Sequence, residues 1–248
     1  MQNRKFTATN KRKTIKKRTI MKSNQKTGRT VGFLLLLIMA LGIPSVVLRG
    51  LSTSMVTSPD FLNEIFQNSF QMRIAVLLDI LTSALWLLIA LLLFPIIKKY
   101  KNSFALWFFG IWLVQFAVII FSNISHLSLL SLSKEFVIAE GADTGYFSTL
   151  GLLLIEEYFW AHFMSLMLFA TAAFSLYYFL FQTKLVPRFL SVWGMVAISL
   201  VFLASWLNIF EVNTSFYFYS QNGIFMVVFM GWLIAKGFNP NEAIPKEG

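Results

Sequence analysis

IAVLLDILTSALWLLIALLLFPII, residues 74–97, contains a single ionisable side chain, Asp79. At ~1.5 Å per residue, a helix of this length covers about 36 Å, which exceeds the ~30 Å hydrocarbon core of a bilayer. Lysines follow directly at positions 98, 99 and 101. A run this apolar that ends in cations is typical of a membrane-spanning helix.

Five further runs of similar length occur on either side of this one. The chain is 57% hydrophobic and 13% charged, whereas about a quarter of the residues in soluble domains are charged. Backbone groups in hydrocarbon must be hydrogen-bonded internally, and the runs are too long and too uniformly apolar for barrel strands. We therefore predict an all-α bundle of about six transmembrane helices. The predicted spans are 31–48, 74–97, 104–122, 158–181, 189–210 and 216–235.

The longest predicted loop is 123–157, and its apolar first third is compatible with an extension of the third span. The predicted organisation is a basic tail at 1–30, a six-helix membrane domain at 31–238 and a short C-terminal tail at 239–248. No internal repeat and no separate soluble domain is visible.

Lys and Arg are distributed unevenly over the segments between spans. The tail at 1–30 holds eleven of them and no acid, and even without it the segments on the same side hold seven, against Arg49, Arg73 and Lys134 on the other side. The excess of Lys and Arg in cytoplasmic loops then predicts that both termini are cytoplasmic.

Three interpretations of the basic tail remain open. The tail can keep the N-terminus in the cytoplasm and attract anionic lipid headgroups. It can instead be a nucleic-acid-binding arm. As a third alternative, translation begins at Met21 and most of the tail is not made. We expect lipid headgroups and no nucleic acid as partners, because the chain has no aromatic groove or recognition helix beyond the tail.

Three stretches resemble a known family when they are taken together in order. They are KLVPRFLSVWG at 184–194, WLIAKGFNP at 232–240 and SLSKEFV at 131–137. The chain resembles, from about Thr27 to Pro240, an uncharacterised bacterial integral-membrane family known as domain of unknown function 4386. The resemblance implies a bacterial cytoplasmic membrane protein of six to seven spans, and it implies no activity. Where members of that family frequently carry acids in the third and last spans, this chain has Gln115 and Met226.

Ionisable groups at membrane depth are functional candidates, because each costs about 2.5–3.5 kcal/mol to insert. Asp79 is predicted about 8–9 Å below the boundary of the second span, bonded to Ser83 or to a neighbouring helix. In the third span, polar and apolar residues recur every three or four positions and so share one helical face. The residues of this stripe are Trp112, Gln115, Ile119, Ser122 and His126. The stripe predicts a face that either packs against other helices or lines a ligand site.

Glu156, Glu157 and His162 lie at the start of the fourth span. At about 100° per residue, His162 lies well around the helix from both glutamates and shares its face with Tyr158 and Ser165. The paired glutamates are therefore predicted to be solvated at the membrane boundary.

These polar residues share one depth, the outer third of the bundle under the predicted topology. We expect an outward-facing polar pocket that binds a small molecule, lipid or ion, without a cofactor. The candidate ligand-binding residues are Asp79, Gln115, His126, Glu157, His162 and Asn208.

Two alternatives involve different chemistry. A proton-coupled or small-molecule transporter would need polar groups in the inner half of the bundle, where charges are absent. A membrane-embedded hydrolase would need zinc held by His126, His162 and Asp79, although no HxxxH or HExxH spacing is present. We favour a non-enzymatic protein without a metal site.

Overall fold

The computed structural model describes residues 2–50, 58, 60–139, 144–212 and 214–239, with side chains from residue 24 onward. Every regular element in these ranges is an α-helix, which confirms the all-α prediction. Six helices are long and apolar enough to cross a membrane, and α3 is short. The helices are α1 (Gln2–Arg49), α3 (Phe61–Gln67), α4 (Ser69–Tyr100), α5 (Asn102–Ile138), α6 (Thr144–Thr183), α7 (Arg188–Ile209) and α8 (Tyr217–Lys236).

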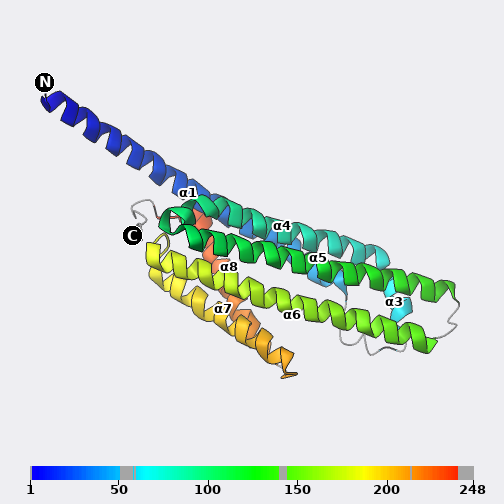
Figure 1. Ribbon diagram of the computed structural model, residues 1–248. Helices are drawn as coiled ribbons and strands as arrows, with labels where there is room; N and C mark the ends of the chain where they lie inside the picture. Colours follow the sequence, from blue (N-terminus) through cyan, green and yellow to red (C-terminus); the bar gives the residue numbers. More distant parts are fainter. Residues whose placement is uncertain (1, 51–57, 59, 140–143, 213, 240–248) are drawn as a thin grey trace.

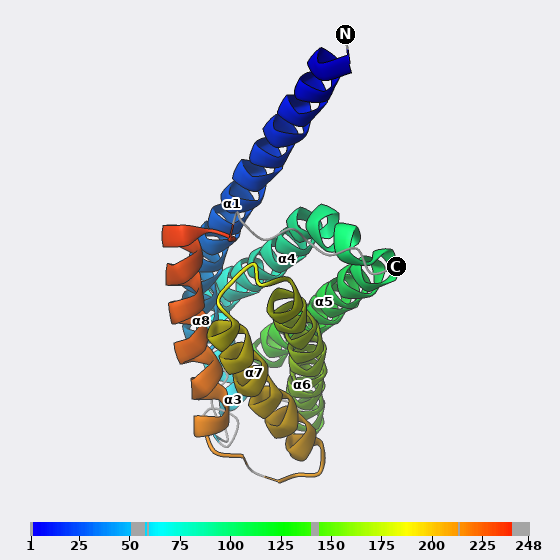
Figure 2. The ribbon, with the colours of Figure 1, turned by 90° about the vertical axis from the view of Figure 1, so that its left-hand side faces the viewer.

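The six long helices form a closed ring. Successive helices are antiparallel, each contacts the next in the order α1, α4, α5, α6, α7, α8, and α8 returns to contact α1 (Figures 1 and 2). The α1–α8 closure depends on two glycines one turn apart on α1. A Cβ on Gly28 would overlap the backbone nitrogen of Phe238, and one on Gly32 would lie 2.8 Å from the nitrogen of Ile234. Small residues at this spacing let two helix backbones approach closely.

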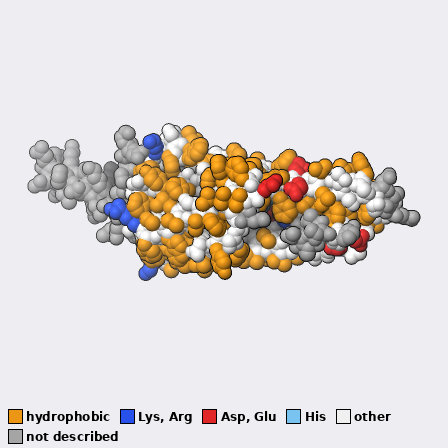
Figure 3. Space-filling model, turned by 90° about the horizontal axis from the view of Figure 1, so that it is seen from below, with side chains coloured by type: hydrophobic (Ala, Val, Ile, Leu, Met, Phe, Trp, Pro, Cys, Tyr) orange, Lys and Arg blue, Asp and Glu red, His pale blue; other side chains and the backbone are white. Residues whose placement is uncertain are grey.

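The two ends of the bundle differ in charge. Both described chain ends lie at one of them, where Arg29 donates to the carbonyl of Ala235 (3.3 Å). Figure 3 shows Lys and Arg gathered at this end and Asp and Glu towards the other. We call them the basic end, marked by Lys98, Lys99, Lys184, Arg188 and Lys236, and the acidic end, marked by Asp60, Glu64, Glu135, Glu156 and Glu157.

The half of the ring nearer the basic end encloses an apolar, aromatic core. Trp86 and Trp112 stack with their ring centroids 4.9 Å apart, and Phe169 meets both rings edge-on. Tyr177, Phe225 and Phe229 extend this packing between α6 and α8. The core therefore holds the helices together where the sequence lacks charges.

The predicted loop at 123–157 is largely wrong. The structure continues α5 to Ile138 and begins α6 at Thr144, so only 139–143 lie between the two helices, and of these 140–143 are outside the described residues. At ~1.5 Å per residue these helices are about 55–60 Å long, and they project beyond the ring at the acidic end (Figure 1). There α3 buries Phe61, Leu62 and Ile65 in a second apolar cluster, whose other members include Leu129, Leu130, Phe136 and Ile155.

Apart from Asn239, the predicted C-terminal tail at 239–248 lies outside the described residues.

Candidate functional site

An ion pair joins the first two spans inside the acidic half of the bundle. Arg49 is the last residue of α1, and its Nη2 lies 2.9 Å from Oδ2 of Asp79, about three turns into α4. The side chain of Arg49 is only 7% exposed and that of Asp79 is 26% exposed. A guanidinium this buried requires a partner, because removing an uncompensated charge from water is costly.

Two side chains of α5 complete the bonding around this pair. Asn123 donates from Nδ2 to Oδ2 of Asp79 (2.8 Å) and turns its Oδ1 towards both terminal nitrogens of Arg49 (3.5 Å). His126, one turn further along, places Nδ1 3.2 Å from Nη1 of Arg49. Both side chains are almost completely buried.

This geometry fixes where the proton of His126 lies. A guanidinium has only donors, so Nδ1 of His126 accepts the hydrogen bond from Arg49 and carries no proton. The proton of the imidazole is then on Nε2. Nε2 is buried and has no hydrogen-bond partner among the described residues. His126 thus presents a buried N–H donor that the protein itself leaves unpaired.

An aromatic side chain of α6, Tyr158, also packs against the guanidinium. Cζ of Arg49 lies 4.8 Å from the ring centroid of Tyr158, which is a favourable cation–π distance. The ring of Tyr158 is 5.7 Å from that of His126 and is stacked on His162, with centroids 6.2 Å apart. We call this group the arginine cluster: Arg49, Asp79, Asn123, His126, Tyr158 and His162.

A second, uncharged polar layer lies closer to the core. Ser83 donates to Oε1 of Gln115 (3.4 Å), and Nε2 of Gln115 donates to Ser165 (3.1 Å), so one amide links α4, α5 and α6. Of the two partners predicted as alternatives for Asp79, the structure shows the neighbouring helices, through Arg49 and Asn123, and Ser83 bonds to Gln115 instead. Every member of the predicted α5 stripe is buried, which confirms that this face packs against other helices.

The six predicted site residues lie in four places. Asp79, His126 and His162 belong to the arginine cluster, and Gln115 belongs to the second layer. Glu157 is exposed and lines a shallow apolar groove of about 590 Å³ on the outer surface of α5 and α6. Asn208 secures the end of α7 by donating to Thr214 and to the hydroxyl of Tyr219, both at 3.0 Å.

Sequence reasoning missed Arg49, Asn123 and Tyr158 as members of the cluster. The sequence does contain one signal for Arg49. An arginine at the end of one span can pair with an aspartate at a similar depth in the next span, as Asp79 is. Asn123 also lies one turn before His126 on the same face.

The zinc hypothesis finds no support in the geometry. Among the described residues, no three His, Asp or Glu side chains are grouped so that they could hold a metal ion. The cation that faces both Asp79 and His126 is the guanidinium of Arg49.

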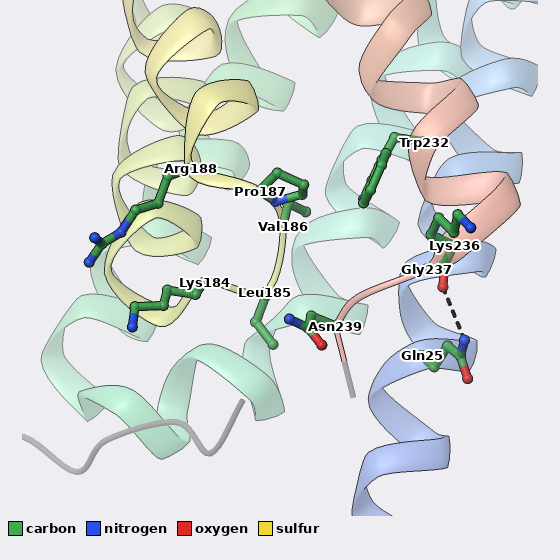
Figure 4. Close-up of a pocket in the computed structure, with 10 residues that line it drawn as sticks. All are labelled: Gln25, Lys184, Leu185, Val186, Pro187, Arg188, Trp232, Lys236, Gly237 and Asn239. Atoms are coloured by element: carbon green, nitrogen blue, oxygen red, sulfur yellow. Dashed lines mark hydrogen bonds between the residues drawn. The ribbon is translucent and has the colours of Figure 1, made fainter. Parts of the chain in front are cut away.

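A separate pocket of about 600 Å³ opens at the basic end. Figure 4 shows it between the α6–α7 linker and the end of α8, with Gln25 of α1 at its edge. The backbone nitrogen of Asn239 donates to the carbonyl of Leu185 (2.7 Å) and holds the two segments together. Two of the stretches that carry the family resemblance, 184–194 and 232–240, thus meet at this pocket.

Six long apolar helices in a closed ring, with their buried charges paired inside, define a multi-pass helical membrane protein. The chain belongs to the family described as domain of unknown function (DUF4386), whose model matches residues 30–237. The resemblance predicted from the sequence is confirmed. No curated protein and no solved structure compared with the chain gave a significant match.

Proposed function

We propose that this chain binds a small polar molecule in the arginine cluster, entering from the side of the membrane that faces the acidic end. The observation that carries the proposal is Nε2 of His126, a buried donor without a protein partner among the described residues. A buried donor left unpaired costs about 1–3 kcal/mol. An acceptor oxygen supplied by a ligand would recover that free energy.

The charges of the cluster narrow the class of ligand. Arg49 and Asp79 offset one another, so the cluster offers no net charge to an ion. It offers the N–H donor of His126, the partly exposed carboxylate of Asp79 and the partly exposed ring of His162. A small neutral or zwitterionic molecule with a carbonyl or carboxylate acceptor and a flat apolar part matches these groups.

The charge distribution supports an orientation. With the basic end in the cytoplasm, as the excess of Lys and Arg indicates, both termini are cytoplasmic and the cluster opens to the outside of a bacterial cytoplasmic membrane. The basic tail at 1–30 then lies beside anionic lipid headgroups, and nucleic acid has no part in the proposal.

We prefer binding over transport because the described residues offer no continuous polar path onward to the basic end. Beyond the second polar layer, the described residues leave a space of only about 10 Å³, with Trp86, Trp112 and Tyr177 among its mostly apolar lining residues. Such a space is about the size of one water molecule. No observation on the described residues favours hydrolysis either.

Cysteine labelling from outside the cell tests the opening of the cluster. The chain contains no Cys, so Asp79→Cys places a single thiol at a partly exposed position of the cluster, and Leu81→Cys places one at an exposed, apolar position of the same helix. We expect a membrane-impermeant, anionic methanethiosulfonate to modify Asp79→Cys in intact cells and to leave Leu81→Cys unmodified. Equal inertness of both thiols would refute an outward opening.

A further inference from the structure

The pocket at the basic end combines positive charge with an apolar floor. Its lining residues include Lys184, Arg188 and Lys236, and none of its ten lining residues is Asp or Glu. The three cations are exposed, whereas Leu185 and Val186, which belong to the α6–α7 linker, are buried. An anion that enters this pocket therefore meets cations at the rim and hydrocarbon below.

The backbone that shapes the pocket is tightly determined. Lys184 directly follows α6 with φ +53° and Gly237 directly follows α8 with φ +69°, so the chain leaves both helices through a residue with positive φ. A Cβ on Gly237 would overlap the carbonyl oxygen of Gln25, whose side-chain amide donates to the carbonyl of Lys236 (3.1 Å). The lining is thus fixed by contacts among α1, α8 and the α6–α7 linker.

Figure 4 shows how the side chains are arranged around the hollow. Trp232 faces Val186 and Pro187 across it, the side chains of Lys184 and Arg188 extend away from Trp232 on the α6 side, and Lys236 lies on the α8 side beside Gln25. The guanidinium of Arg188 lies 5.1 Å from the ring centroid of Phe181, so its position is partly set by that contact. The long Lys side chains retain the rotamers needed to turn towards a bound anion.

We propose that this pocket binds the phosphate of an anionic phospholipid headgroup. Basic pockets between transmembrane helices, at the level of the headgroups, are suited to such lipids. A tryptophan at the same level is typical of the membrane–water boundary. The apolar part of the pocket would receive the glycerol and the first carbons of the acyl chains, which a free phosphate lacks.

The test measures lipid binding to the full chain by native mass spectrometry. Delipidated protein is titrated with phosphatidylglycerol, cardiolipin or phosphatidylcholine, and wild type is compared with Lys184→Gln/Arg188→Gln/Lys236→Gln. The matched control, Lys98→Gln/Lys99→Gln/Lys101→Gln, removes the same charge from the same end without altering the pocket lining. Monodisperse elution of each variant establishes that it is folded.

We expect wild type to prefer the anionic lipids to phosphatidylcholine and the pocket variant to lose at least about tenfold in affinity for them. The affinity of the Lys98→Gln/Lys99→Gln/Lys101→Gln control for these lipids should change by less than about twofold. Equal losses in the two triple variants would reduce the effect to general surface attraction and overturn the proposal. Displacement of bound phosphatidylglycerol by millimolar inorganic phosphate would also overturn it, because free phosphate would then suffice as the ligand.

Discussion

At the scale of residues, Arg49 and Asp79 organise the acidic half of the bundle. Helical periodicity alone predicted the buried α5 stripe that includes Gln115 and His126, because side chains three and four apart must share a face. It did not predict which helix those residues would meet. Partners across helices depend on the rotation and depth of each helix, and an apolar run specifies neither.

The pairing of Arg49 with Asp79 predicts a non-additive pattern of stabilities. Asp79→Leu leaves the guanidinium buried without its anion and should cost about 2–3 kcal/mol, below the usual range for a buried pair because Asp79 is partly exposed. The double variant Arg49→Leu/Asp79→Leu should recover most of this loss. Thermal unfolding in detergent, followed by tryptophan fluorescence, measures it as a drop of about 5–10 °C for the single variant. Losses that simply add in the double variant would contradict the pairing.

The hydrogen bond from Arg49 predicts the tautomer of His126. With only two histidines in the chain, His162→Gln leaves His126 as the sole imidazole in protein labelled with ¹⁵N-histidine. Solid-state NMR should then show an unprotonated Nδ1 and a protonated Nε2. A proton on Nδ1 would remove the unpaired donor on which the binding proposal rests.

At the scale of elements, the sequence predicted the spans well and their extensions poorly. Hydropathy marks the part of a helix that lies in hydrocarbon, but α5 continues through Ser131, Lys134 and Glu135, and α6 begins well before Glu156 and Glu157, so polar residues interrupt the apolar runs within both helices. Those turns are held by α3 and the second apolar cluster, a tertiary contact that a single-segment pattern does not contain. The Gly28–Gly32 spacing is typical of a close-packing face, but it does not indicate which helix packs there.

Ring closure by α1 and α8 predicts a position-specific effect of glycine replacement. Gly28→Val places a side chain against the backbone of Phe238, whereas Gly231→Val on α8 meets nothing within 4 Å. Both changes replace a helical glycine with the same residue, so their difference isolates the α1–α8 contact. We expect Gly28→Val to lower the unfolding temperature by about 5 °C or more relative to Gly231→Val. Equal midpoints would contradict the close approach of these helices.

At the scale of the whole molecule, two features govern the orientation in the membrane. The even number of spans places both termini on the same side, and the charge difference between the two ends of the bundle indicates which side that is. Composition was enough to predict a multi-pass membrane protein, because 57% hydrophobic residues need an apolar solvent. It was not enough to locate a ligand, which depends on how side chains from α1, α4, α5 and α6 converge.

The orientation predicts opposite labelling of the two ends. In this cysteine-free chain, Glu135→Cys at the acidic end should react with a membrane-impermeant maleimide in intact bacterial cells, and Lys99→Cys at the basic end should react only after permeabilisation. Both positions are exposed. Labelling in the reverse order would invert the topology and place the arginine cluster on the cytoplasmic side.

The most direct test of the binding proposal is a cryo-electron microscopy map of the protein extracted with its native membrane lipids, at a resolution that shows ordered water. We predict density larger than a single water within hydrogen-bond distance of Nε2 of His126, contacting Tyr158 or His162 and reaching the surface beside Asp79. A lone ordered water at Nε2, or protein atoms closing over it, would contradict the account and leave the cluster a structural ion-pair network.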